Sequence, residues 1–348
     1  MSGAVASVIV PCRNAAATVE AALAGALASP LREIEVIAVD DGSTDSTAQV
    51  LAGIAARDPR VSVLSSGGRG VSAARNVALD AAKGEFVFFL DADDTVEPDF
   101  YPLAVEAMRR DDADYCRVAH DETFIETGRN VAFPLKGDYR FSTPDEIREK
   151  YLPCFFGYSL SQVRAWYRGE RLGSNREMGG VVFGCFRSSI IRDGRIRFDE
   201  TVEIFEDAMF TSEYLLRCRR TTCIERVLYH YRLSERGSML SKLSGPGFFE
   251  NKLRLLARRN AMDAAHGGKL AHLYEASCVF SLLEILRAAF RMRGCLRKGV
   301  ATFFRYGGDP AVRNALHSFP LSWRKPFLAA AVAICGIIFP QSKGDKTK

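Results

Sequence analysis

The sequence lacks the patterns that mark several large classes of protein. Its nine cysteines are odd in number and form no C-x-x-C or zinc-type pair, so most are expected to be small buried side chains in a reducing compartment. No G-x-x-x-x-G-K-[ST] loop is present, so a P-loop NTPase is not supported. The first residues contain no charged segment that leads into an apolar core. We therefore expect no secretory signal, and a protein in the cytoplasm or on the cytoplasmic face of a membrane.

Apolar runs long enough to cross a bilayer are also missing. The run Phe327–Phe339 holds thirteen apolar or small residues, which as a helix would span about 20 Å against roughly 30 Å for a bilayer core. Residues 241–348 carry 18 Lys or Arg against 6 Asp or Glu. We expect this basic tail to lie peripherally on an anionic membrane surface, and packing of the run on the protein core is the alternative. No nucleic-acid motif accompanies the basic charge, so no nucleic-acid partner is expected.

The first third of the chain alternates apolar runs with helical segments. The 348 residues, 47% hydrophobic and 26% charged, have the composition of a folded protein long enough for two domains. Such alternation predicts an α/β fold with a mostly parallel, Rossmann-like sheet flanked by helices. The expected strands are Ser7–Val10, Ile34–Val39, Val61–Leu64, Phe86–Leu90 and Asp114–Val118, and the expected helices are Ala15–Ala28, Asp45–Arg57, Ser72–Ala82 and one that begins near Pro98.

Later segments are less regular. Residues 119–180 show no clear period, whereas residues 181–232 regain strand and helix character, with a helix expected over Glu206–Arg217. The segment Gly247–Arg293 is expected to be helical throughout and to end at Gly294. This predicts a helical C-terminal extension.

Two acidic clusters close the second and the fourth predicted strands. Carboxylates at strand ends lie where an open α/β sheet binds its ligand. Because so many like charges repel, we expect a divalent cation, Mg²⁺ or Mn²⁺, that bridges to a phosphate. Simpler interpretations exist for two members, since Asp45 can cap the following helix and Asp94 can lie in an exposed turn. The clusters are Asp40-Asp41-Gly42-Ser43-Thr44-Asp45 and Asp91-Ala92-Asp93-Asp94.

A competing pattern lies between them. Residues 68–73 match G-x-G-x-x-A, which is typical of dinucleotide-binding proteins. This match follows the third predicted strand rather than the first, and it leaves both acidic clusters unexplained. A dehydrogenase is therefore not favoured.

Four motifs follow one another in the first part of the chain: Val8-Ile9-Val10-Pro11-Cys12-Arg13-Asn14, the first acidic cluster, Gly70-Val71-Ser72-Ala73-Ala74-Arg75-Asn76 and the second acidic cluster. In these motifs and their order the sequence resembles family 2 glycosyltransferases, which have the GT-A fold and include enzymes of bacterial cell-surface polysaccharide synthesis. The resemblance is dense over the first third of the chain and sparse over the middle third. One departure is Cys12-Arg13, where many members carry a small residue and an aromatic one.

The resemblance implies roles for these residues. It assigns the nucleoside, usually uridine, to Pro11, Asn14 and Asp41, with Asp40 beside them. It assigns the binding of the ribose and of the metal that bridges the diphosphate to the second cluster. In that cluster, Asp91 and Asp93 are the expected metal ligands and Asp94 is a further candidate.

Two arginines are further candidates for contacts with the donor. Arg75, just inside a helix start, is expected to contact phosphate or base, and the alternative is an exposed arginine that pairs with Asp80. Arg232 resembles a tail residue that binds the diphosphate. The neighbouring His230 is expected to be a hydrogen-bonded strand histidine.

A third acidic pair, Glu206-Asp207, stands at a predicted helix start. Complementation of the helix dipole would explain it, but it also resembles the family's Glu-Asp motif. That resemblance makes Asp207 the general base for the acceptor hydroxyl and Glu206 a supporting residue.

The implied reaction is inverting transfer of a sugar from a metal-bound UDP-sugar to a saccharide or lipid-linked hydroxyl. The corresponding regions are a donor half over residues 1–118, an acceptor and catalytic half over 119–240, and a basic helical region over 241–348. The alternatives are a nucleotidyltransferase, for which the first strand lacks a glycine-rich basic loop, and a non-catalytic nucleotide-sugar binder.

Overall fold

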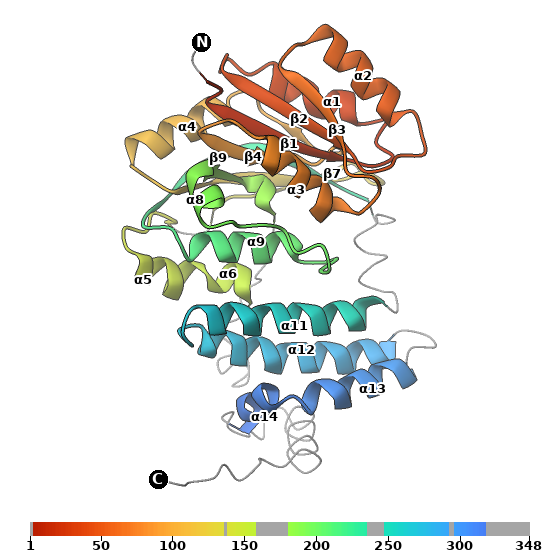
Figure 1. The fold of residues 1–348 in the computed structure, drawn as a ribbon, viewed down its shortest axis with the longest axis vertical. Coiled ribbons are helices and arrows are strands. Elements are labelled where there is room, and N and C mark those ends of the chain that lie inside the picture. Colours follow the sequence, from red (N-terminus) through yellow and green to blue (C-terminus); the bar gives the residue numbers. More distant parts are fainter. Residues whose placement is uncertain (1–2, 136–137, 158–179, 235–246, 292–295, 318–348) are drawn as a thin grey trace. The chain divides into compact units, whose positions relative to one another are not determined.

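The computed structural model describes residues 3–135, 138–157, 180–234, 247–291 and 296–317 (Figure 1). The chain divides into two compact units. The first comprises Met1–Leu152 and Gly179–Gly237, and the second comprises Pro153–Met178 and Ser238–Lys348. The predicted donor, acceptor and C-terminal regions divide the chain by function rather than by compactness, and that division stays a prediction.

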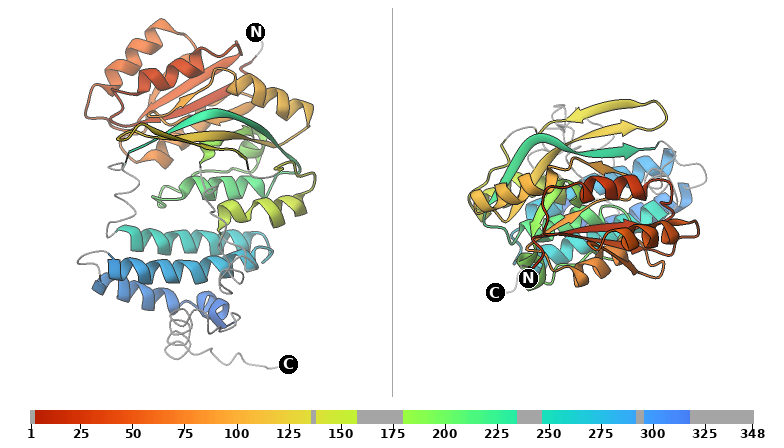
Figure 2. Two further views of the ribbon diagram at one scale, coloured as in Figure 1. Left: turned by 180° about the vertical axis from the view of Figure 1, so that it is seen from behind. Right: turned by 90° about the horizontal axis from the view of Figure 1, so that it is seen from above.

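The first unit is built on a nine-stranded sheet with the order β3-β2-β1-β4-β8-β6-β9-β5, and β7 pairs with β6 (Figures 1 and 2). The first four strands along the chain are mutually parallel, as predicted. In the first, second and fourth of these strands the apolar runs are buried, which is typical of strands covered on both faces, whereas the third lies at the edge of the sheet and is largely exposed. These strands are β1 (Ala6–Cys12), β2 (Ile34–Asp40), β3 (Val61–Ser65) and β4 (Phe86–Phe89).

The remaining strands extend the sheet past β4. β6 (Tyr115–Phe124) and β9 (Thr221–Leu233) pair in parallel, and β8 (Gly184–Arg187) lies antiparallel between β4 and β6. The two antiparallel partners at the margins are β5 (Thr95–Val96), which pairs with β9, and β7 (Arg129–Phe133), which pairs with β6. The prediction of a mostly parallel α/β sheet is thus confirmed. The first half of β6 is fully buried and the second half is only partly buried.

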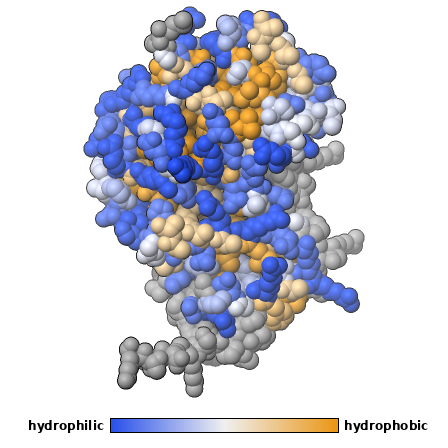
Figure 3. Space-filling model, in the orientation of Figure 1, coloured by the Kyte–Doolittle hydropathy of each residue, from blue (hydrophilic) through white to orange (hydrophobic). Residues whose placement is uncertain are grey.

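Helices flank this sheet (Figure 2). On the face of the first unit drawn in Figure 3, most surface residues are hydrophilic, as expected when helices bury apolar strands. Of the seven cysteines in the described part of the chain, all are free thiols and only Cys154 is not buried. The helices are α1 (Val19–Leu27), α2 (Thr47–Arg57), α3 (Val71–Ala81), α4 (Phe100–Arg110), α5 (Pro144–Glu146), α8 (Ser188–Asp193) and α9 (Glu206–Leu215), with a π-helical turn at Ile147–Tyr151 and a 3-10 turn at Val181–Phe183.

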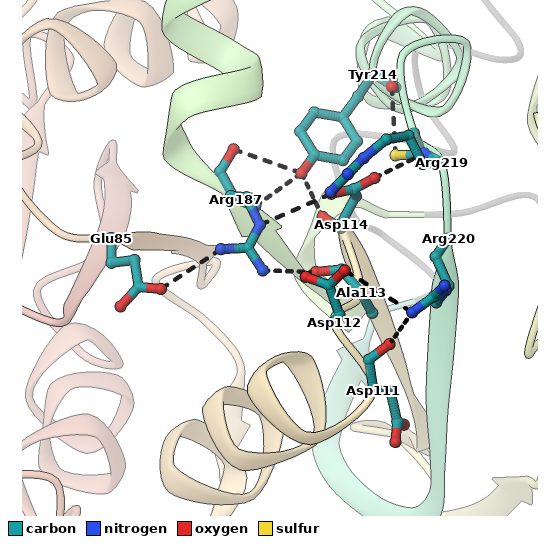
Figure 4. A network of polar contacts seen from close by, with 10 residues as sticks. Glu85, Asp111, Asp112, Ala113, Asp114, Arg187, Tyr214, Arg219 and Arg220 are labelled. Carbon is teal, nitrogen blue, oxygen red and sulfur yellow. Dashed lines mark hydrogen bonds and ion pairs between the residues drawn. The ribbon is translucent and has the colours of Figure 1, made fainter. Parts of the chain in front are cut away.

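A polar network fixes the far end of α9 to the sheet (Figure 4). Tyr214 donates its hydroxyl to the Asp114 carbonyl at 2.5 Å and accepts the Arg187 N–H at 2.7 Å. The buried Asp114 carboxylate accepts the N–H of Arg219 at 2.6 Å and lies beside the Arg187 guanidinium. This network holds α9, β8 and the start of β6 together, and so fixes the helix whose first turn carries the predicted catalytic pair.

The second unit is helical in the described residues. It contains α6 (Pro153–Phe156), α11 (Gly247–Ala265), α12 (Ala271–Arg291), α13 (Leu296–Gly307) and α14 (Pro310–His317). The prediction of one helix over Gly247–Arg293 is wrong at residues 266–270. Gly267 and Gly268 there adopt φ angles of 66° and 75°, left-handed values that end a helix readily.

Nowhere in the described ranges is there a helix with the length and apolar character needed to span a membrane. The run Phe327–Phe339 and the predicted helix end at Gly294 lie outside the described residues. Membrane association therefore stays a prediction.

Candidate active site

Both acidic clusters lie at the same edge of the sheet, on either side of β1. Cys12 is in register with Asp40, and its carbonyl accepts the Asp41 N–H at 2.8 Å. On the other side of β1, Leu90 donates its N–H to the Ile9 carbonyl at 2.9 Å. The carboxyl ends of β2, β1 and β4 therefore adjoin, which is where an open sheet of this kind presents its ligand site.

The loop after β1 and the first cluster are hydrogen-bonded to one another. Asn14, with a positive φ of 50°, donates its N–H to Ser43 Oγ at 3.0 Å and accepts the Thr44 N–H on Oδ1 at 2.8 Å. Asp40 accepts the Ser43 N–H at 3.3 Å. Asp45, one residue before the N-cap Ser46, accepts the N–H of Thr47, the first residue of α2, at 2.9 Å. The two loops therefore form one braced surface beside Pro11, which is half-buried at the end of β1.

Asp41 is buried, and its side chain connects the end of β2 to the glycine-rich loop, which is Gly67-Gly68-Arg69-Gly70. Its carboxylate accepts the Ser66 hydroxyl at 2.6 Å and the Gly70 N–H at 3.0 Å, and Arg13 lies 3.4 Å away. A side chain at Gly42 would be strained, since the φ angle there is 68° and a Cβ would lie 3.0 Å from Cα of Gly68. Asp41 therefore shapes this loop, and its predicted contact with the nucleoside is untested.

Arg75 connects the second acidic cluster to the third acidic pair. From the first turns of α3, its guanidinium contacts Asp91 at 3.0 Å and Glu206 at 2.9 Å and lies 5.3 Å from the centre of the Phe198 ring. Burial lowers the pKa of Arg75, but the two carboxylates outweigh this effect and the net pKa is raised. The alternative interpretation of Arg75, as an exposed arginine that pairs with Asp80, is wrong. Arg75 is buried, and Asp80 pairs with Arg197 instead.

The second cluster contains carboxylates in different surroundings. Asp94 is buried, accepting the Tyr229 hydroxyl at 2.6 Å and the Arg232 N–H at 2.7 Å, so its interpretation as an exposed turn residue is wrong. Burial and the charges of Asp91 and Asp93 raise the pKa of Asp94 well above its ordinary value. Water reaches Asp93, yet desolvation by the surrounding protein and the charge of Asp91 raise its pKa too.

Alternate residues of β9 face this cluster, and two of them were not identified from the sequence. The Tyr229 hydroxyl accepts the Asp91 N–H at 3.3 Å besides donating to Asp94. Tyr231, two residues on, has the pKa of its hydroxyl raised by burial and by four surrounding carboxylates, those of Asp91, Asp94, Asp93 and Asp207. The i, i+2 spacing of these tyrosines in an expected strand was a usable signal.

The other prediction for this strand is confirmed for His230. Its ring nitrogens lie 3.0 Å from Asp121 and 3.1 Å from Glu97, so it is a hydrogen-bonded strand histidine. Arg232 lies close enough to lower the pKa of Asp93, opposing the two effects that raise it.

The carboxylates of Asp91 and Asp93, at the end of β4, are suitable ligands for a small divalent cation. In the part of the chain that the structure describes, no group of three or more His, Cys, Asp or Glu side chains is arranged to hold a metal. Mg²⁺ commonly needs only one or two carboxylates, since waters and substrate phosphates complete its shell. A bound cation would relieve the mutual repulsion between the carboxylates of Asp91 and Asp93. With both of its oxygens hydrogen-bonded, Asp94 is better placed to position β9.

The third acidic pair opens α9, as expected. Asp207 is half-buried and accepts the Gly180 N–H on Oδ2 at 2.9 Å. The preceding Phe205 has a φ of 68°, a left-handed value that is strained for a bulky residue. Burial and Asp207, opposed by Arg75, raise the pKa of Glu206 to about 7. Glu206 and Asp207 therefore occupy distinct electrostatic environments within one helical turn.

The raised pKa of Glu206 predicts a pH-dependent stability. Between its ordinary value of 4.5 and about 7, the folded chain binds more protons than the unfolded chain. The free energy of unfolding should therefore fall as pH rises through this window. Chemical denaturation of the wild type and Glu206→Gln at pH 5, 6 and 7 measures it. We expect a shallower fall in the variant, and equal slopes would contradict this assignment.

Comparison with known proteins finds a family model and several relatives that match the N-terminal part of the chain. A sequence model described as Glycosyl transferase family 2 matches residues 7–167. The uncharacterized glycosyltransferase YibD of Escherichia coli is 28% identical over 65% of this chain and 61% of its own length. The succinoglycan biosynthesis protein ExoO of Rhizobium meliloti is 30% identical over 64% of this chain and 60% of its own length. The chain thus spans about three-fifths of these relatives.

A solved structure agrees with the sequence relatives. Residues 1–349 of Staphylococcus aureus TarS, in complex with UDP-GlcNAc, superpose with a TM-score of 0.67 at 20% identity, covering 96% of this chain and 89% of that one. This likeness shows a shared GT-A fold. TarS itself is a poly(ribitol-phosphate) β-N-acetylglucosaminyltransferase, 28% identical over 72% of this chain and 39% of its length. Residues 7–167 therefore match the Glycosyl transferase family 2 model, and the chain shares the GT-A fold.

Proposed function

We propose that this protein is an inverting glycosyltransferase that moves a sugar from a UDP-sugar to the hydroxyl group of a saccharide or lipid-linked acceptor. The observation that carries the proposal is the bridge made by Arg75. It joins Asp91, at the end of β4, to Glu206, beside the proposed base Asp207 at the start of α9. A single site thus combines a diphosphate-binding edge with a candidate base.

Each group has a role that its surroundings support. Asn14, Asp40, Asp41 and Pro11 form the braced loop surface proposed to hold the nucleoside. Arg75 positions Asp91 and Glu206 rather than the diphosphate directly, because both of its terminal nitrogens contact carboxylates. The guanidinium of Arg232, near Asp93, is proposed as the phosphate ligand.

The reaction follows from these roles. Asp207 accepts the proton of the acceptor hydroxyl, and that oxygen attacks the anomeric carbon of the donor sugar. The carbon–oxygen bond to UDP breaks as the new bond forms, so one displacement inverts the anomeric centre and UDP leaves with the electron pair. Asp91 and Asp93 would hold Mn²⁺ or Mg²⁺, which supplies charge neutralisation for the departing diphosphate.

Calorimetric titration of UDP with and without Mn²⁺ tests the donor and metal assignments together. We expect UDP binding that strengthens with Mn²⁺ in the wild type. In Asp93→Ala this strengthening should be lost, because the exposed carboxylate proposed as a ligand is gone. The control Asp99→Ala, a charge loss at a surface ion pair with Arg226, should behave like the wild type. Absence of UDP binding under both conditions would point to another nucleotide donor.

The acceptor and the setting are proposed on the relatives. ExoO and TarS are named for succinoglycan biosynthesis and for glycosylation of poly(ribitol-phosphate), which supports a role in cell-surface polysaccharide synthesis. A lipid-linked acceptor would give the predicted membrane contact of the basic tail a purpose. A nucleotidyltransferase and a non-catalytic nucleotide-sugar binder are the competing proposals. Substitution of the proposed base, Asp207, separates a glycosyltransferase from a non-catalytic binder, because only the transferase would lose turnover.

A further inference from the structure

The last part of β9 brings a tyrosine hydroxyl to the candidate active site. Tyr231 is half-buried, and its hydroxyl makes no hydrogen bond with the residues that the structure describes. Tyr229, two positions earlier, is fully buried and donates its hydroxyl to Asp94 at 2.6 Å. Burial and nearby carboxylates raise the pKa of Tyr231, so its phenol stays protonated and can act as a hydrogen-bond donor. The fold therefore leaves one tyrosine hydroxyl available at this position.

Ring contacts show which face of the sheet Tyr231 occupies. The rings of Tyr229 and Tyr231 both contact the ring of Phe183, with centroid distances of 5.2 and 6.3 Å. The two tyrosines therefore lie on the same face of β9, as i, i+2 residues of a strand should. The N–H of Arg232 donates to Asp94 at 2.7 Å, so residues on both sides of Tyr231 are fixed to that carboxylate. Tyr231 is thus held close to the second acidic cluster.

The contacts of Phe183 continue from Tyr231 to the proposed base. A Cβ on Gly180 would lie 3.2 Å from the Phe183 ring, so these two residues are close together. Gly180 in turn donates its N–H to Asp207 at 2.9 Å. Tyr231 is therefore connected on one side to the second acidic cluster and on the other to Asp207. In the proposed reaction the transferred sugar occupies the space between these groups, because its anomeric carbon is bound to the diphosphate and is attacked from the opposite side.

We propose that the Tyr231 hydroxyl donates a hydrogen bond to a hydroxyl group of the transferred sugar and thereby helps to select the donor. This inference rests on the proposed function and extends it with a residue that recognises the sugar rather than the nucleotide. A neutral phenol can both donate to and accept from a sugar hydroxyl. The carboxylates around Tyr231 disfavour a bare phosphate at this position, because like charges repel. Selectivity follows because a sugar without the matching hydroxyl leaves the phenol unpaired.

Calorimetric titration tests this contact, with UDP, UDP-glucose, UDP-galactose and UDP-GlcNAc as ligands in the presence of Mn²⁺ and without acceptor. Tyr231→Phe should bind the preferred UDP-sugar of the wild type about tenfold more weakly, because one hydrogen bond is lost. Its affinity for UDP should be unchanged, since UDP lacks the transferred sugar. Its thermal midpoint should also be unchanged, because no hydrogen bond to the described residues is lost. The matched control is Tyr101→Phe, which removes a buried hydroxyl of α4 that has no partner among the described residues, and it should behave like the wild type.

Donor analogues that each lack one sugar hydroxyl identify the contacted group. The analogue without that group should bind the wild type about tenfold more weakly than the full donor and should bind Tyr231→Phe with no further loss, because both changes remove the same hydrogen bond. Equal weakening of UDP and UDP-sugar in Tyr231→Phe would assign the hydroxyl to the nucleotide and overturn the proposal. Unchanged affinity for every UDP-sugar would overturn it too, and in both cases UDP binding by the wild type leaves the proposed donor class standing. If the wild type binds neither UDP nor any UDP-sugar, the proposed function fails and this inference fails with it.

Discussion

Asp207→Asn should lower kcat by about a thousandfold while leaving the affinity for UDP unchanged. The carboxylate accepts the Gly180 N–H on Oδ2 at 2.9 Å and the Ala208 N–H on Oδ1 at 2.7 Å, and asparagine can retain one of these two hydrogen bonds through its own oxygen. The substitution therefore removes the capacity to accept a proton at the cost of one hydrogen bond to the backbone. An inverting transferase that depends on this base would lose turnover and keep its donor site.

The measurement pairs release of UDP from the donor with UDP titration by calorimetry. Asp193→Asn, which removes an exposed carboxylate from α8 in the same unit, is the matched control and should retain full turnover. Unchanged turnover in Asp207→Asn would remove the proposed base. If neither the wild type nor the variants release UDP but all of them bind it, the non-catalytic alternative gains support.

Arg75→Met should reduce the free energy of unfolding by about 3 kcal/mol and abolish activity. The guanidinium is buried and balances Asp91 and Glu206, so its loss leaves two carboxylates repelling one another in a poorly solvated site. Arg75→Lys should be intermediate, since an ammonium cannot present two separated donor nitrogens in one plane. Urea denaturation measures the stability, and the same variants are assayed for UDP release.

A surface ion pair provides the control for this prediction. Arg197 contacts Asp80 at 2.6 Å, but both side chains are largely exposed, so Arg197→Met should cost less than about 1 kcal/mol. Adding Glu206→Gln to Arg75→Met should restore part of the stability, because one of the two uncompensated carboxylates is then neutral. Equal effects of Arg75→Met and Arg197→Met would show that the bridge does not hold the site together.

Much of the donor edge could be predicted from local sequence. The apolar runs of β1, β2 and β4, each followed by a helical segment, specify parallel strands, because such runs are stable only when buried on both faces. The positions of both acidic clusters at strand ends follow directly from that arrangement. Local patterns also indicated the start of α9 and its acidic pair.

Other features depend on contacts between distant segments. Asp94 looks like an exposed turn residue until β9 brings Tyr229, 135 positions later, into hydrogen bond with it. The pairing of Arg75 with Glu206 joins residues 131 positions apart. The local sequence around Arg75 contains no acid that predicts this pairing.

The sequence by itself determined where the carboxylates stand along the chain and which strands carry them, because strand burial and turn chemistry are encoded within a few residues. Only the tertiary structure decided which charges are buried, which are paired and which remain free for a ligand. Those outcomes depend on the order of strands across the sheet, with β9 returning beside β6, and on the packing of α9 against it. Electrostatic compensation in a buried site is a property of three-dimensional neighbours, and here the neighbours come from segments more than a hundred residues apart.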